Sequence, residues 1–298
     1  MKRFLPVLAA LAIAVLLLLR PQEAAGAVRD GLALCAGTVI PSLFPFFAAI
    51  SLLLQLGAAE ALGRLCGPVM NPLFRMRGEC ALPLLAGLLG GYPSGARTAA
   101  NMYAQGRLTR QEAEVLLGFC DNCGPGFLLG YAGAAVLGDA RLGVLLWGVH
   151  MLSALLTGLV VTRVWRQRGT PRALPKGGGE TESLARAFTA SARGAVESTL
   201  NVCAFVVLFQ TLAALLPGGL PWYALGGLEL VSGMSVLPGG RAGFVAAAVL
   251  AGWGGVSVHC QALAVTEGLS FRTHWAGKAL QAGISALLAA AALRLLPG

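Results

Sequence analysis

Arg97 is the residue of this sequence with the clearest candidate chemical role, because it follows a break in an apolar segment. An apolar run from Pro83 to Leu89 leads into Gly-Gly-Tyr-Pro-Ser-Gly at residues 90–95, and Arg97 comes two residues later. A guanidinium can bind a carboxylate through two parallel hydrogen bonds, and the Ser94 hydroxyl and nearby backbone N–H groups can add donors. The alternative is a helix that ends at the membrane surface, with Arg97 as an interface residue.

A second polar segment, Cys120-Asp121-Asn122-Cys123, also interrupts apolar sequence. Its two cysteines have the spacing of some metal and redox sites, but the sequence offers no second cysteine pair and no nearby histidine to complete a tetrahedral site. Asn122 suits the lining of a polar cavity better, since its amide group both donates and accepts hydrogen bonds.

The third polar segment contains Ser257, His259 and Gln261. Its Gly-Val-Ser-Val-His sequence resembles part of the nucleophile turn of a hydrolase, but that motif needs a final glycine and a strand–turn–helix context. The three side chains are better interpreted as groups that face a cavity, or, for His259, as a hydrogen-bonding group within a helix bundle. Glu197 and Glu229 also lie in apolar sequence, where acids are functional candidates.

The composition predicts the class of protein. Of the 298 residues, 56% are hydrophobic and 12% are charged, whereas soluble domains have about a quarter charged residues. The mean hydropathy is +0.74, and the 41 glycines suit helices that pack closely in a bilayer. The sequence therefore predicts an all-α polytopic membrane protein embedded in the lipid bilayer. The net charge of +9 does not indicate a nucleic-acid partner, because the basic residues are scattered over loops.

The apolar segments predict about seven to eight spans, some of them broken or re-entrant. Residues 4–19 are interpreted as a retained span closed by Arg20, with a cleaved signal peptide as the alternative. The capping box from Thr109 to Glu112 predicts a helix that starts at Arg110, and residues 109–137 fit a re-entrant hairpin. Pro41 and Pro45 should bend or open their helix. The other apolar segments lie near residues 34–56, 83–97, 142–164, 196–216, 222–237, 242–253 and 275–296.

The two halves of the chain look related. Ala86-Gly-Leu-Leu-Gly-Gly91 is echoed by Ala251-Gly-Trp-Gly-Gly255, and each is followed by polar residues and another helix. Broken helices at matching places are typical of transporters with two inverted-topology repeats, whose binding site lies between the repeats. The expected organisation is an N-terminal span with a surface segment (1–33), a first repeat (34–165), a cytoplasmic linker (166–193) and a second repeat (194–298).

Four motifs resemble those of a known family. Residues 41–47, 90–96, 119–125 and 255–258 occur in the order found in the YlbJ (SpoVV) family of sporulation integral membrane proteins, and the resemblance covers nearly the whole chain. That family belongs to a wider group with the nucleoside-recognition Gate domain. The resemblance implies export of dipicolinate, a small organic anion, across the outer forespore membrane, which derives from the mother cell.

The sequence thus predicts membrane transport of a small organic anion, with no enzyme activity, cofactor or metal. The alternatives are transport of nucleosides or other neutral polar solutes and a non-transporting membrane scaffold in sporulation. A homo-oligomer is left open. The predicted substrate-binding residues lie in the three polar segments: Gly91, Tyr92, Pro93, Ser94, Gly95, Arg97, Asn122, Ser257, His259 and Gln261.

The positive-inside rule gives a first testable prediction. Arg272 and Lys278 are counted with the cytoplasmic basic residues, and the four Lys and Arg residues of segment 166–183 outnumber its two acids. A Gly178→Cys variant, in a background without reactive cysteines, should therefore resist an impermeant thiol reagent added to intact cells. Ready labelling from outside would contradict the predicted topology.

Overall fold

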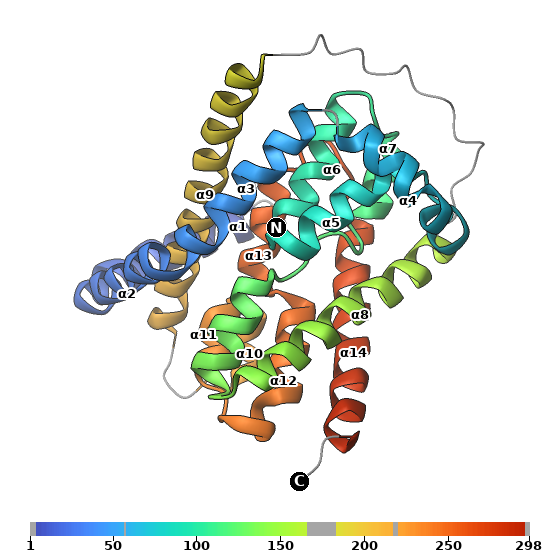
Figure 1. The fold of residues 1–298 in the computed structure, drawn as a ribbon. Coiled ribbons are helices and arrows are strands. Elements are labelled where there is room, and N and C mark those ends of the chain that lie inside the picture. The colour runs from blue at the N-terminus through green and yellow to red at the C-terminus, as the bar shows by residue number, and fades with distance from the viewer. Residues whose placement is uncertain (1–3, 57, 166–182, 217–219, 296–298) are drawn as a thin grey trace.

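The computed structural model describes residues 4–56, 58–165, 183–216 and 220–295, and the regular elements in these ranges are all helices (Figure 1). The predicted all-α class is confirmed. Most of the predicted linker, residues 166–182, lies outside the described residues. Its last part is helical, because α9 (Leu184–Leu215) begins within the range assigned to it.

Four described helices are long and apolar enough to cross a bilayer. They are α8 (Ala140–Val164), α9, α12 (Gly240–Trp253) together with α13 (Gly255–Ala264), and α14 (Arg272–Leu295). A fifth span arises if α1 (Leu5–Leu19) and α2 (Pro21–Leu34), which bend by 100° near Arg20, cross as one unit.

This number is lower than the expected seven to eight because the other apolar segments fold into shorter helices. Helices of this length do not cross the hydrocarbon core alone and need protein around their ends. The shorter elements are η1 (Cys35–Val39), α3 (Ile40–Gln55), α4 (Ala58–Phe74), η2 (Gly78–Cys80), α5 (Ala81–Gly90), α6 (Ser94–Ala104), α7 (Arg110–Leu116), η3 (Gly126–Val136), α10 (Trp222–Leu228) and α11 (Leu230–Ser235).

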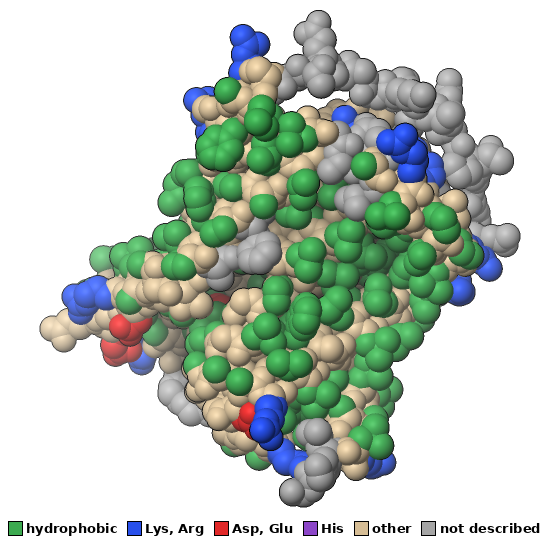
Figure 2. Space-filling model, viewed as in Figure 1, with side chains coloured by type: hydrophobic (Ala, Val, Ile, Leu, Met, Phe, Trp, Pro, Cys, Tyr) green, Lys and Arg blue, Asp and Glu red, His purple; other side chains and the backbone are tan. Residues whose placement is uncertain are grey.

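The surface agrees with a bilayer environment. Hydrophobic side chains are spread across the whole face drawn in Figure 2, and the charged side chains gather at its edges and ends. Large apolar residues stand exposed along the long helices, as Leu18, Val144 and Leu287 illustrate. Contiguous exposed apolar surface of this kind indicates contact with lipid in a helical membrane protein. The chain is accordingly described as an integral membrane protein.

The helix breaks fall where the sequence predicts them. α5 gives way to α6 at Gly91, and α12 gives way to α13 at Gly254. Both glycines have positive φ, +82° and +90°, which side chains other than glycine rarely adopt. The capping box is also confirmed, because Thr109 and Glu112 exchange both of its hydrogen bonds at the start of α7.

Two prolines shape the helical segment formed by η1 and α3. η1 is a π-helical turn that ends two residues before Pro41, and Pro45 lies inside α3. Proline lacks a backbone N–H and crowds the preceding turn, so a wider turn at this point agrees with the predicted opening of the helix.

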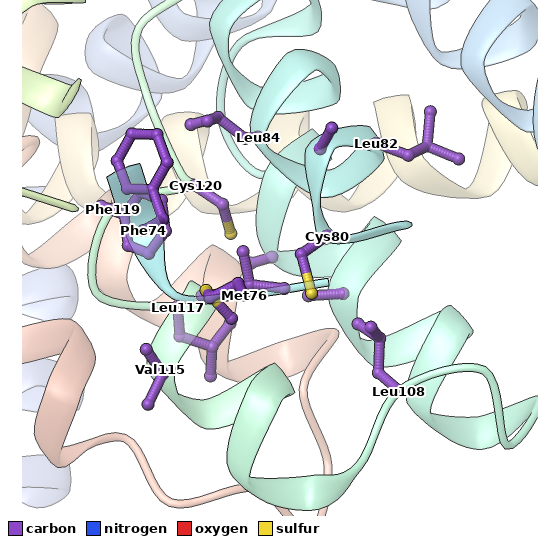
Figure 3. Packing of buried hydrophobic residues seen from close by; sticks show 14 of the residues in the cluster. Phe74, Met76, Cys80, Leu82, Leu84, Leu108, Val115, Leu117, Phe119 and Cys120 are labelled. Atoms are coloured by element: carbon purple, nitrogen blue, oxygen red, sulfur yellow. The ribbon is translucent and has the colours of Figure 1, made fainter. Parts of the chain in front are cut away.

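A hydrophobic cluster fixes the position of the segment after α7. Phe74 of α4 stacks on Phe119 with ring centroids 5.5 Å apart, and both side chains are buried (Figure 3). Gly158 of α8 lies beneath the two rings, where a Cβ atom would stand 2.6 Å from Phe119. The close approach of α8 therefore depends on this glycine, and it holds Phe119 at the entrance to the polar segment 120–123.

An ion pair joins the start of α7 to the segment before α5. Arg77 donates from Nε and Nη2 to the two carboxylate oxygens of Glu112, at 2.7 and 2.8 Å, and Thr109 N donates to the same carboxylate. Burial by itself raises the pKa of Glu112, but the hydrogen bonds from Arg77 and Thr109 more than offset it and hold the pKa below the ordinary 4.5.

Glu112→Gln should lower the melting temperature of the purified protein in detergent, because it leaves the Arg77 guanidinium without its charge partner. The expected loss is about 3 kcal/mol. Because the pKa is lowered, this stability is present above pH 4.5 and is lost as the pH falls through the lowered value. Glu23→Gln, which removes an exposed pair with Arg20, serves as the control and should leave the melting temperature nearly unchanged. Equal shifts in the two variants would contradict the prediction.

Candidate functional site

The first and third polar segments meet in the folded chain. The Tyr92 hydroxyl donates to the backbone oxygen of Ala251, over 3.1 Å, just before the break at Gly254. A Cβ atom on Gly254 would stand 3.2 Å from that hydroxyl. The breaks of the two halves are thus in contact, as the repeat pattern predicts, while the predicted inverted relation of the halves stays a prediction.

The second polar segment packs directly on the first. A Cβ atom on Gly87 or Gly95 would lie 1.7 or 1.9 Å from the backbone oxygen of Cys120, and one on Gly91 would lie 3.0 Å from Gly124 N. Only glycine leaves room for backbone at these distances. α5, α6 and the segment 120–124 therefore form one tightly interlocked unit without side-chain atoms between the three backbones.

A buried lysine anchors the polar segments. Lys278 of α14 is fully buried, and its Nζ donates to the backbone oxygen of Asp121 and to Gln281 Oε1, both over 2.7 Å. Gln281 Nε2 in turn donates to Asn122 Oδ1 over 2.8 Å. The ammonium also lies 4.9 Å from the centre of the Tyr92 ring, within cation–π range. A cation without water needs such partners, and these tie α14 to the segment 120–123.

Histidines extend this network on two sides. His150 of α8 accepts a hydrogen bond from Cys123 N over 3.0 Å through Nε2. His259 Nδ1 lies 2.9 Å from His274 Nε2, and His274 Nδ1 lies 3.1 Å from the backbone oxygen of Leu117. All three rings are buried. They join α8 to Cys123, α14 to Leu117, and α13 to α14.

Arg97 faces a separate space, named here the cationic hollow. Its guanidinium donates to the Ser198 hydroxyl of α9 and lies 4.0 Å from the exposed carboxylate of Glu197. The Arg97 side chain is 27% exposed. The Ser94 hydroxyl, at the first residue of α6, is buried and has no hydrogen-bond partner. The cationic hollow has a free volume of about 60 Å³ and is lined by Phe47, Ile50, Ser51, Ser94, Arg97, Thr98, Asn101, Gly194 and Ser198.

A second space, named here the apolar hollow, lies where the breaks converge. It measures about 90 Å³, and its walls are mainly aliphatic and aromatic. Its polar residues are few and include Glu229 and Gln261. Glu229 is buried and caps α11 by accepting from Val231 N and Ser232 N, at 3.0 and 2.7 Å. The polar segments reach this space through Gly91, Tyr92, Cys123, Gly124 and Gln261.

The structure thus distributes the predicted substrate-binding residues over different surroundings. Ser94 and Arg97 line the cationic hollow, whereas Gly91, Tyr92 and Gln261 line the apolar hollow. Four others sit in the packed interior, where Gly95 meets Cys120, Asn122 bonds Gln281, Ser257 accepts from Gln261 and His259 contacts His274. Pro93 is buried at the N-cap of α6.

Lys278 is the main residue that the sequence reading missed. Its assignment to the cytoplasmic basic residues is wrong, because its side chain is fully buried in the centre of the polar network. A signal was present: Lys278 and Gln281 are three residues apart in an apolar helix and so share one face. An ionisable residue inside an apolar span marks a functional candidate by default.

Comparisons with known proteins agree with the resemblance. Residues 36–161 match the Gate domain, described as nucleoside recognition. The chain is 34% identical over 147 residues to the sporulation integral membrane protein YlbJ of Bacillus subtilis (strain 168), a match that covers 49% of this chain and 36% of that protein. No solved structure gives a significant match. Residues 36–161, called here the Gate region because of this match, carry α5, α6 and the polar residues 120–123. The predicted resemblance to the YlbJ family is confirmed for about half of the chain.

Proposed function

We propose that this protein transports a small organic anion across a membrane and binds a carboxylate of that anion in the cationic hollow. The observation that carries the proposal is that Arg97 and the buried, unpartnered hydroxyl of Ser94 line the same hollow at the start of α6. A helix N-terminus of this kind favours negative charge, and a guanidinium adds a geometry that matches a carboxylate. Ser94 lacks the partner that a bound carboxylate oxygen would supply.

The existing partners of Arg97 leave it available to a ligand. Ser198 is a neutral acceptor, and Glu197 lies at the outer limit of an ion pair with a largely exposed carboxylate. An exposed pair of this length contributes little stability. An anion that enters the cationic hollow therefore displaces weak interactions and gains a charge-assisted one.

The specific solute that we propose is dipicolinate, exported during spore formation across the outer forespore membrane. The support is the resemblance to the YlbJ family, together with the chemistry of an aromatic dicarboxylate. Such a molecule presents carboxylates to Arg97 and a flat ring that suits the mainly apolar walls of the apolar hollow. The paired helix breaks in both halves are typical of transporters and have no role in a passive scaffold.

A second candidate function is transport of a nucleoside or another neutral polar solute. The observation that favours it is the apolar hollow, where Gln261 and the Tyr92 ring stand among aliphatic walls. Small-molecule sites commonly combine such walls with a few polar groups. In that case Gln261 would orient the solute, and Arg97 would be dispensable for transport.

Arg97→Gln should abolish dipicolinate flux into proteoliposomes at matched protein levels, because the carboxylate loses its charged partner. The expected loss in binding is about 2–5 kcal/mol, roughly thirty-fold to several-thousand-fold in affinity. Arg97→Lys should retain part of the flux, since it keeps the charge without the planar fork.

Arg193→Gln is the matched control, because Arg193 is an exposed arginine on α9, and it should transport normally. Undiminished dipicolinate flux in Arg97→Gln would remove Arg97 from the site. Nucleoside flux without dipicolinate flux in the unmodified protein would favour the second candidate.

A further inference from the structure

The carboxylate of Asp121 lies at the same helix end as the cationic hollow. Its Oδ1 accepts from Ala96 N over 3.4 Å, and Ala96 stands between Ser94 and Arg97 in the first turn of α6. The side chain is fully buried, and its other oxygen, Oδ2, has no hydrogen-bond partner. A carboxylate so poorly supported is unusual, because buried charges normally have a full set of partners.

The neighbouring cation, Lys278, does not donate a hydrogen bond to the Asp121 carboxylate. Lys278 donates to the backbone oxygen of Asp121 and to Gln281, so its hydrogen bonds go to neutral acceptors. Burial without hydrogen bonds favours the neutral form of a carboxyl group, while a cation nearby favours the charged form. The balance between the two forms is therefore sensitive to any further charge. The titratable groups whose charges act on Asp121 are Tyr92, Cys120, Cys123 and Lys278. The elements packed around residues 117–123 also place Arg97 of α6, His150 of α8 and His274 of α14 near this segment.

We propose that Asp121 is the proton-binding residue of the transport cycle, and that it takes up a proton when an anion binds in the cationic hollow. This inference rests on the proposed function. A substrate carboxylate at Ser94 and Arg97 brings a second negative charge to the helix end that Asp121 already faces. Protonation of Asp121 removes that repulsion. The carboxylate gains one proton from water on the side from which the anion enters and returns it when the anion leaves.

The coupling between anion binding and proton uptake is reciprocal, so it can be measured through the anion affinity or through the number of protons taken up. If the anion raises the proton affinity of Asp121, then protons must raise the anion affinity by the same factor. The affinity of the unmodified protein for dipicolinate should therefore fall as the pH rises, by at most about tenfold per pH unit. Asp121→Asn should behave as the permanently protonated form, since an amide is neutral and its oxygen can still accept from Ala96 N.

The test is calorimetric titration of the full-length protein with dipicolinate between about pH 6 and pH 8, where free carboxylates are ionised. Each titration is run in two buffers of different ionisation enthalpy, so that the number of protons taken up is measured directly. The unmodified protein should take up nearly one proton per anion in the range where its affinity depends on pH. Asp121→Asn should bind with a pH-independent affinity and take up none.

Asp139→Asn is the matched control, because Asp139 is an exposed aspartate whose Oδ1 accepts a hydrogen bond from Arg141 N at the start of α8. It should keep the proton uptake and pH dependence of the unmodified protein. Proton uptake that persists in Asp121→Asn would overturn the assignment. Dipicolinate binding by the unmodified protein without pH dependence or proton uptake would overturn the inference and leave the proposed function standing. No dipicolinate binding at any pH would instead reject the proposed function, and the inference with it.

Discussion

The central constraint on this structure is that an ammonium group without access to water must be surrounded by acceptors. Lys278 is fully buried, and the acceptors it uses are a backbone oxygen at Asp121 and the side chain of Gln281. An unsatisfied buried cation would be far more destabilising than any single hydrophobic contact is stabilising. The irregular segment 120–123 must therefore stay where Lys278 can reach it. That requirement links the last helix of the chain to the Gate region of the first half.

The need of buried polar groups for hydrogen-bond partners also explains how irregular backbone is tolerated in so apolar a protein. Broken helices leave N–H and C=O groups without intrahelical partners, and lipid supplies none. Here protein covers the breaks: Tyr92 reaches Ala251, Asn122 donates back to the oxygen of Phe119, and His150 accepts from Cys123 N. Side chains, two of these three from distant parts of the sequence, thus replace the water that a loop of a soluble protein would use.

Local features of this protein could be predicted from sequence, whereas its long-range partnerships could not. The capping box at Thr109, the glycine breaks and the all-helical class follow from residue types and short spacings. The pairing of Lys278 with Asp121, or of Arg97 with Ser198, depends on how helices far apart in the chain pack together. Periodicity carries no information about such distances. For the same reason, the ten predicted site residues divide among two hollows and a packed interior.

The interlocking glycines determine which parts of the molecule can move independently. Backbone packed directly on backbone, as at Gly87 and Gly95 against Cys120, leaves no compressible side-chain layer in which one element could slide past another. By contrast, α6 meets α9 at the cationic hollow through the tips of long or small polar side chains, such as Arg97 and Ser198. Rotation about side-chain bonds can break and remake that contact. In the transport cycle proposed above, the seam between α6 and α9 can therefore open more readily than the glycine-locked unit, which stays rigid.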